Sequence, residues 1–291
     1  MGELALCTST ELYNILNQST KFSRLAEPNY LCLLDARSKR EYNESHVITG
    51  RRVKQDESMQ FLLPESIELA SMKYCVVYDS RTNSLEGEGP ALECAKVISQ
   101  VCHKPVLVLR GGYEEFSAYY HFFRSQKVFW MPQEIDDFQP YPIEIIHGLL
   151  YMGDQSQAND HHIHKDLKIK SEVNVSLEPI QLSMPILHIS VPDSCDSDLL
   201  QFFSTICDFI DCHMAPNSAV LVSSTLGISR SSAVIIAYLI HSRRWTLQEA
   251  WSHVRKCKTN MRPNRGFVQQ LSEWEKTVLG HQITDISEPR F

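Results

Sequence analysis

The sequence lacks several features, and each absence argues against a class of protein. No apolar run approaches the ~18 residues that a membrane-spanning helix needs. An excess of basic residues is also missing, because 28 Lys and Arg face 35 Asp and Glu, and the net charge of −7 argues against a general nucleic-acid-binding surface. The first residues, MGELALCTSTELYN, contain no arginine and do not resemble a secretory or transit signal. We therefore expect a cytoplasmic protein, although the sequence leaves import into an organelle open.

Paired cysteines at metal-binding spacing are absent as well. None of the nine cysteines forms a C-x-x-C pair, and without a signal peptide we expect all of them to be reduced. The local histidine cluster HHIH (161–164) has no second ligand pair at zinc spacing, so we interpret it as a solvated polar segment. The sequence predicts no metal site and no cofactor.

Alternating strand and helix patterns predict an α/β fold in two parts. Residues 30–37 (YLCLLDAR) and 74–79 (YCVVYD) are apolar runs that reach an acidic residue, a pattern typical of buried parallel strands. In the second part, we expect strands within 143–154, 172–176, 185–191 and 219–223 and helices at 231–242, 246–257 and 266–279. The periodicity fails between them, which predicts a domain at 1–125, a linker at 126–140 and a domain at 141–291.

The stretch AVLVSSTLGISRSSAVIIAYLI (219–240) reads as a strand, a loop of small residues and a helix. Backbone N–H groups at a helix N-terminus and the helix dipole favour an anion there. Gly227 is suited to a positive φ or a close backbone approach, and Arg230 can grip two phosphate oxygens. The predicted phosphate-binding residues are Ser224, Thr225, Leu226, Gly227, Ile228, Ser229 and Arg230. The alternative is a serine-rich turn that only starts a helix.

The second half resembles the dual-specificity phosphatase family, whose loop reads His-Cys-x5-Arg. The segments that carry this resemblance, over about residues 141–280, are EIIHGLLYMGD, GISRSSAVIIAYLI and MRPNRGFVQQLSEWE. The resemblance implies the Cys-dependent phosphatase fold. It also implies that Ser224 stands at the nucleophile, Ser223 at the preceding histidine and Asp193 at the general acid.

These departures predict a catalytically silent site. The family attacks with a thiolate, whereas a serine hydroxyl needs an adjacent general base, which the loop does not offer. Arg230 and the loop remain, so phosphate binding is still expected. Asp193 is either a relic of the acid or a cap for a helix near Asp198, and we favour the structural role.

The first part resembles a rhodanese domain, as found before the catalytic domain in MAP-kinase phosphatases. Its landmarks are LVLRGGYEEF and, within LLDARSKREYNESHVITG, Asp35, Arg37, His46 and Gly50. The loop after YCVVYD contains no cysteine, so sulfur transfer is not expected. A possible kinase-docking cluster consists of Arg51, Arg52 and Lys54. Because Asp56 and Glu57 follow directly, we favour a solvated surface of mixed charge.

As a whole, the chain resembles STYX-like pseudophosphatases with an N-terminal rhodanese domain. The resemblance implies a regulatory protein that binds phosphorylated proteins or scaffolds signalling kinases or phosphatases. Two alternatives stay open at this point: a weak residual phosphatase acting through Ser224, and a pure scaffold whose loop does not bind phosphate.

Overall fold

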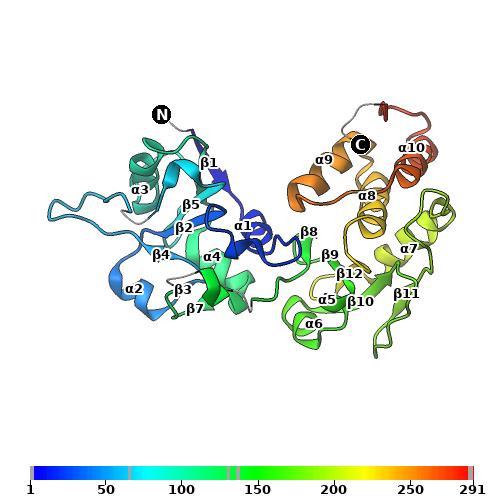
Figure 1. The fold of residues 1–291 in the computed structure, drawn as a ribbon, viewed down its shortest axis with the longest axis horizontal. Coiled ribbons are helices and arrows are strands. Elements are labelled where there is room, and N and C mark those ends of the chain that lie inside the picture. Colours follow the sequence, from blue (N-terminus) through cyan, green and yellow to red (C-terminus); the bar gives the residue numbers. More distant parts are fainter. Residues whose placement is uncertain (1–2, 65–66, 130–131, 136–137, 288–290) are drawn as a thin grey trace. The chain divides into compact units, whose positions relative to one another are not determined.

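The structure, a computed structural model, describes residues 3–64, 67–129, 132–135, 138–287 and 291. The chain divides into two compact units, Met1–Pro140 and Tyr141–Phe291, each with a sheet of its own (Figure 1). None of the helices in the described part of the chain is long and apolar enough to cross a membrane. All nine cysteines are free.

The first unit is built on a parallel sheet with the strand order β1-β6-β5-β2-β4. The two apolar runs that predicted strands form β2 and β5, which pair side by side with Cys32 opposite Cys75. The five strands are β1 (Leu4–Cys7), β2 (Leu31–Asp35), β4 (Arg51–Arg52), β5 (Tyr74–Tyr78) and β6 (Val106–Leu109). Strand β4 is only two residues long and forms one edge of the sheet.

Helices connect these strands, as the alternating pattern predicted. They are α1 (Ser9–Leu16), α2 (Lys39–Glu44), α3 (Pro90–Ser99) and α4 (Gly112–Tyr119). Capping boxes start two of them, Thr8 with Glu11 at α1 and Ser38 with Glu41 at α2, because each side chain bonds a backbone N–H of the other residue. Helix α3 packs its apolar face on β5 and β6, where Ile98, Val77 and Val106 are buried in one cluster.

The stretch 126–140, for which we expected a linker, lies within the first unit. The carbonyl of Lys127 bonds Nε2 of the buried His46 at 3.1 Å, and Ile135 is buried in the short 3-10 helix Pro132–Ile135. Strand β7 (Arg124–Ser125) just before it pairs with β3 (His46–Val47). These contacts hold the described part of the stretch against the domain. Residues 130, 131, 136 and 137 lie outside the described residues.

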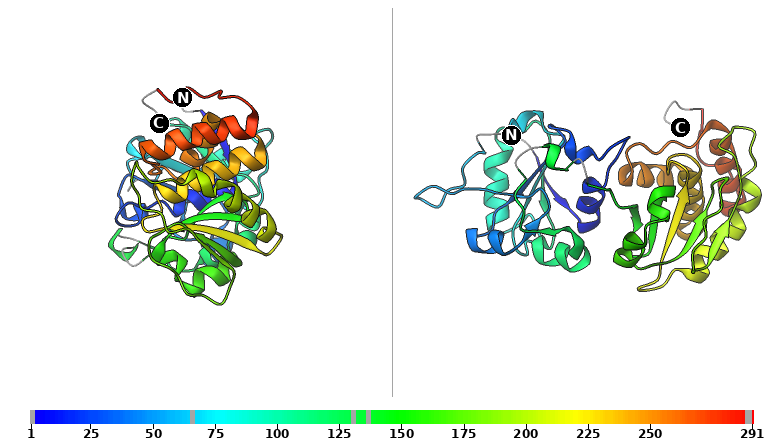
Figure 2. Two further views of the ribbon diagram at one scale, coloured as in Figure 1. Left: turned by 90° about the vertical axis from the view of Figure 1, so that its right-hand side faces the viewer. Right: turned by 60° about the horizontal axis from the view of Figure 1, so that its bottom comes forward.

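The second unit contains a five-stranded sheet with the order β11-β10-β12-β9-β8, in which only β8 is antiparallel to its neighbour. The strands are β8 (Ile143–Ile146), β9 (Leu150–Asp154), β10 (Ile169–Asn174), β11 (Ile186–His188) and β12 (Ala219–Ser224). The helices are α5 (Gln155–Ala158), α6 (His161–Leu167), α7 (Phe203–His213), α8 (Arg230–Arg243), α9 (Leu247–Cys257) and α10 (Arg265–Leu279). Helices α7 to α10 gather on one face of the sheet, and α5 and α6 lie on the other (Figure 2).

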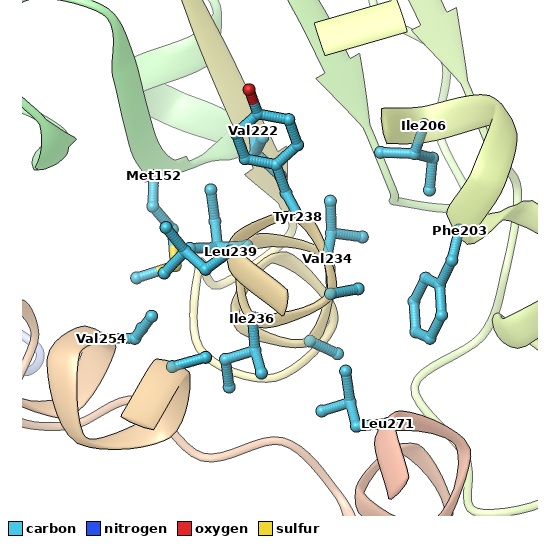
Figure 3. Packing of buried hydrophobic residues seen from close by; sticks show 14 of the residues in the cluster. Met152, Phe203, Ile206, Val222, Val234, Ile236, Tyr238, Leu239, Val254 and Leu271 are labelled. Atoms are coloured by element: carbon cyan, nitrogen blue, oxygen red, sulfur yellow. The ribbon is translucent and has the colours of Figure 1, made fainter. Parts of the chain in front are cut away.

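Helix α8 runs through the centre of this unit, and residues 233–240 are all buried. A helix that is apolar on every side must be enclosed on every side. Figure 3 shows the neighbours that enclose it: Met152 and Val222 from the sheet, Phe203 and Ile206 from α7, Val254 from α9 and Leu271 from α10. The predicted capping box of Thr246 and Glu249 starts α9. This packing fixes the N-terminus of α8 at the end of β12.

The histidine-rich segment 161–164 is not the solvated stretch that we expected. It forms the first turn of α6, where the Asp160 carboxylate accepts hydrogen bonds from the backbone N–H groups of His162 and Ile163. Ile163 and His164 face inward and are buried, because α6 covers β10. The segment is therefore one short amphipathic helix of the fold.

Candidate functional site

The candidate site is the loop between β12 and α8. Ser224 is the last residue of β12, and its side chain is almost completely buried. Its hydroxyl donates to Oγ of Ser231 at 3.1 Å and accepts from the backbone N–H of Gly227 at 3.2 Å. Among the described residues these are its only hydrogen-bond partners, so no carboxylate, imidazole or amine is bonded to it. The position holds an oxygen in a cradle of donors, without a base.

Gly227 allows the loop to close against the neighbouring strand. Its φ is +65°, and a Cβ at this position would lie 2.7 Å from the carbonyl oxygen of Gly153 in β9. Both conditions predicted from the sequence are confirmed, the positive φ and the close backbone approach. A larger residue would push the loop away from β9.

Arg230 begins α8, and only 7% of its surface is exposed. Its Nη1 donates to the carbonyl of Val191 at 2.9 Å and its Nη2 to Oγ1 of Thr225 at 3.0 Å. Its Nε is buried and has no hydrogen-bond partner within the described part of the chain. Burial lowers the pKa of the guanidinium, and the nearby Asp193 opposes this shift. An incompletely bonded, partly desolvated cation therefore lies at the loop.

Asp193 lies beside this loop and does not cap a helix. Its Oδ1 accepts hydrogen bonds from Oγ of Ser229 at 2.7 Å and from Nδ2 of Asn264 at 2.8 Å. The helical turn that we expected it to cap is instead bonded by Asp198, whose Oδ1 accepts from the backbone N–H of Gln201 at 3.3 Å. The capping role predicted for Asp193 was wrong, because its carboxylate turns toward the loop.

Ser223 points away from the loop, since neighbouring residues of a strand face opposite sides of a sheet. Its hydroxyl donates a 2.5 Å hydrogen bond to Oε1 of Glu172 on the adjacent strand β10. Glu172 is completely buried, and its Oε2 has no partner among the described residues. Burial raises the pKa of Glu172 to about 7, although the hydrogen bond from Ser223 opposes the shift. The sequence analysis did not identify Glu172.

A second buried charge that the sequence analysis missed is Lys258, which follows α9. Burial lowers its pKa to about 8, and Asp154 opposes the shift. Asp154 pairs with Ser224 across β9 and β12, so this lysine belongs to the surroundings of the loop. A lysine near the end of an amphipathic helix gives no sign in the sequence that it will be buried.

The corresponding loop of the first unit, after β5, is closed around a carboxylate. Asp79 accepts hydrogen bonds from the backbone N–H groups of Arg81, Thr82 and Ala91. The hydroxyl of Thr82 donates a further bond of 2.6 Å to it. The backbone donors at the start of α3 are thus already occupied by a side chain of the same domain.

The structural landmarks of the first unit form a buried network. Arg37 and Asp35 make an ion pair of 2.6 Å, and the guanidinium also lies 3.9 Å from the ring centroid of Tyr113. His46 stacks on Tyr42 with ring centroids 4.1 Å apart. Arg51, Arg52 and Lys54 lie elsewhere, along the edge strand β4 and the residues after it.

Comparison with known proteins assigns both units. The family model for the dual specificity phosphatase catalytic domain matches residues 150–277, and the model for the rhodanese-like domain matches residues 19–119. Protein 123R of Invertebrate iridescent virus 6, named as a tyrosine phosphatase, is 33% identical over 135 residues, which are 46% of this chain and 92% of that protein. Dual specificity protein phosphatase 1 of Mus musculus is 27% identical over 289 residues, which are 85% of this chain and 78% of that protein.

The chain belongs to the rhodanese-domain-containing dual-specificity phosphatase family. The expected α/β fold, a rhodanese-like domain followed by a dual-specificity-phosphatase-like domain, is confirmed. Human Dual specificity protein phosphatase 5 is 33% identical over 141 residues, which are 47% of this chain and 36% of that protein, so the chain spans only about a third of this relative.

Two solved structures of this phosphatase family are also similar. Human DUSP28 has 27% identity and a TM-score of 0.46 over 48% of this chain and 98% of its own. The human tyrosine phosphatase-like serine/threonine/tyrosine-interacting protein has 25% identity and a TM-score of 0.43 over the same shares.

Proposed function

We propose that this protein is a catalytically inactive member of the dual-specificity phosphatase family that binds phosphorylated proteins. The observation that carries the proposal is the environment of Ser224, whose hydroxyl meets another hydroxyl and a backbone N–H. A serine attacks phosphorus only when a base removes its proton, and a thiolate in its place would need none. Loss of a nucleophile costs on the order of 10⁴- to 10⁶-fold in rate in an unrelated serine hydrolase.

The same site retains what phosphate binding requires. The unpartnered Nε of the buried Arg230 is available to an oxyanion, and the positive end of α8 lies beside it. A neutral hydroxyl at residue 224 also removes the repulsion that a thiolate exerts on a phosphate. At 4 Å and an effective dielectric constant near 20, that repulsion is about 4 kcal/mol for each pair of unit charges before screening. The substitution that prevents turnover thus favours retention of the ligand.

The role that follows is regulatory. A domain that holds a phosphorylated segment without hydrolysing it shields that segment or brings its owner to another protein. We propose phosphorylated signalling proteins as partners, including the kinases and phosphatases of pathways in which the family acts, with MAP kinases first among them. The first domain lacks a thiol in the loop after β5, and Asp79 occupies the backbone donors there, so we propose no sulfur transfer.

The test uses the purified full chain and a phosphotyrosine peptide. We expect calorimetry to detect binding, while phosphate release stays at the level of buffer. Release above buffer that is lost in Ser224→Ala would instead favour a weak residual phosphatase. Binding that persists unchanged in Arg230→Ala would favour a scaffold whose loop does not read phosphate.

A further inference from the structure

The first unit contains a groove that the proposed function does not use. It has a volume of about 560 Å³ and lies between the edge strand β4 and the residues that precede Trp130. The chain that follows β4 projects from the domain as a hairpin, closed by the bridge between Gln55 and Phe61 (Figure 1). The apolar side chains of its wall include Val53, Leu62, Leu63, Ile67, Val128 and Phe129.

Two of these apolar side chains are exposed rather than covered. Leu62 is 45% exposed and Leu63 is 42% exposed, although both are large. Neighbouring exposed leucines in a concave surface are typical of a place where another molecule docks.

The groove is also positively charged. Arg51, Arg52 and Lys54 all line it, and within the described residues none of the three forms an ion pair. Asp56, which follows them in the sequence, is turned into the hairpin, where its Oδ1 accepts from the backbone N–H groups of Ser58 at 2.8 Å and Gln60 at 2.9 Å. The mixed charge that we expected from the sequence is therefore sorted by the fold, with the cations in the groove and this carboxylate outside it.

A smaller cavity of about 340 Å³ continues the groove and shares Arg51, Ile67 and Phe129 with it. The charge of its lining is opposite, because Glu27 and Glu68 stand there. The two hollows together have a basic end, an apolar middle and an acidic end. A ligand that fits this order carries its negative charge at the end near Lys54.

We propose that this groove binds a short linear segment of a partner protein in which acidic residues are followed by apolar ones. The acidic residues face Arg51, Arg52 and Lys54, and the apolar side chains enter between Leu62, Ile67 and Phe129. In the docking that family resemblance implies, the cations of this domain enter an acidic groove on a kinase. Here the groove belongs to this chain and the partner supplies the inserted segment, so the site is independent of the phosphate loop.

The probe is a fluorescein-labelled peptide with consecutive glutamates followed by alternating leucines, titrated with the full chain and followed by fluorescence anisotropy. We expect saturable binding that weakens at high salt, because exposed charges are screened. A peptide with lysine in place of glutamate, and one with serine in place of leucine, are expected not to bind. Absence of binding by the first peptide, or equal binding of all three, overturns the proposal.

Charge reversal locates the site. Arg51→Glu and Lys54→Glu are each expected to weaken binding of the acidic peptide by about tenfold, roughly 1.4 kcal/mol. Arg110→Glu is the matched control, because Arg110 is an exposed arginine of the same domain outside the groove, and it is expected to have no effect. Lys54 is exposed, so its variant tests the groove even where Arg51→Glu does not fold. Equal affinity of the Lys54 and Arg110 variants overturns the assignment to this groove.

The apolar half is tested separately with Leu62→Ser, which leaves the charge unchanged and is expected to weaken binding by severalfold. Vesicles of anionic phospholipid are the remaining comparison. If they bind the chain through Arg51 and Lys54 while the peptide does not, the groove is a lipid-facing surface and the proposal is wrong. Arg230→Ala is expected to bind the acidic peptide like the wild type, which separates this site from the phosphate loop.

Discussion

The hydroxyl of Ser223 donates a 2.5 Å hydrogen bond to Glu172, a completely buried carboxyl group one strand away. Both side chains project from the face of the sheet opposite to Ser224, where α5 and α6 lie. In the family pattern, residue 223 is a histidine. In this chain it is a hydroxyl whose partner, Glu172, is neutral or charged according to the pH, because burial raises its pKa to about 7.

We expect Glu172→Gln to stabilise the protein at high pH. In the unfolded chain, a glutamate ionises near pH 4.5, whereas burial keeps Glu172 protonated up to about pH 7. Stability therefore falls as the pH rises from about 4.5 to 7, and the full loss is present above pH 7. The glutamine variant avoids that loss and can still accept the hydrogen bond from Ser223. The expected gain at pH 8 is on the order of 2–3 kcal/mol, vanishing near pH 4.

Urea denaturation at several pH values measures this difference. Glu273→Gln, at an exposed position of α10, is the matched control and is expected to show no such pH-dependent gain. If the two variants follow the wild type in parallel at every pH, Glu172 does not titrate in the way described.

Dormant chemistry is tested by Ser223→His combined with Ser224→Cys. A thiolate at residue 224 would accept from the N–H of Gly227 and the hydroxyl of Ser231, and Arg230 and the start of α8 would lower its pKa. Asp193 lies beside the loop, within 2.7 Å of Ser229, in reach of an acid's role. We expect measurable hydrolysis of an aryl phosphate, abolished by adding Arg230→Met. A folded double variant that binds phosphate without turnover would mean that more of the site has been lost than these two residues.

Gly227→Val is expected to weaken phosphopeptide binding although it changes no charge. The new Cβ would meet the carbonyl oxygen of Gly153 at 2.7 Å, and valine disfavours the φ of +65°. Gly148→Val is the matched control, because its φ is +66° and no atom lies within 4 Å of the added Cβ. Calorimetry is expected to show lower affinity for the first variant and wild-type affinity for the second. Equal affinities would mean that the turn does not shape the phosphate site.

The buried pair of Arg37 and Asp35 predicts a large effect on stability. Arg37→Met leaves the Asp35 carboxylate without its counter-ion in the core, which costs about 3–5 kcal/mol for a buried pair. Arg40→Met breaks the pair with Glu44 on the surface of α2, where about 0–1 kcal/mol is expected. The urea midpoint of the full chain distinguishes the two, and similar shifts would contradict the structural importance of the buried pair.

Elements with a strong local pattern were predictable, and those defined by distant contacts were not. The apolar runs of β2, β5 and β12 and the capping box of α9 follow from neighbouring residues. Strand β4 has only two residues, and α6 is held by burial against β10, so neither has a sufficient pattern of its own. In IKSEVN, Glu172 reads as a residue on an exposed strand face. The fold buries it because helices cover that face as well.

The loop residues were predictable as a set because strand, glycine and arginine are adjacent in the sequence. The partners of Asp193 were not, since Ser229 and Asn264 lie 36 and 71 residues further along the chain. A spacing rule placed Asp193 at the acid position, but only the three-dimensional contacts distinguish a loop contact from a helix cap.

The central claim is that the loop reads phosphate through Arg230, and one titration tests it most directly. A phosphorylated peptide and its unphosphorylated counterpart are titrated into wild type, Arg230→Lys and Arg230→Ala at matched salt. Lysine keeps the charge but loses the two parallel hydrogen bonds, and alanine leaves the phosphate unpaired, at a cost of about 2–4 kcal/mol. We predict that the phosphorylated peptide binds in the order wild type, lysine, alanine, and that the unphosphorylated peptide binds weakly and equally to all three. Equal affinity of the three proteins for the phosphorylated peptide would contradict the account.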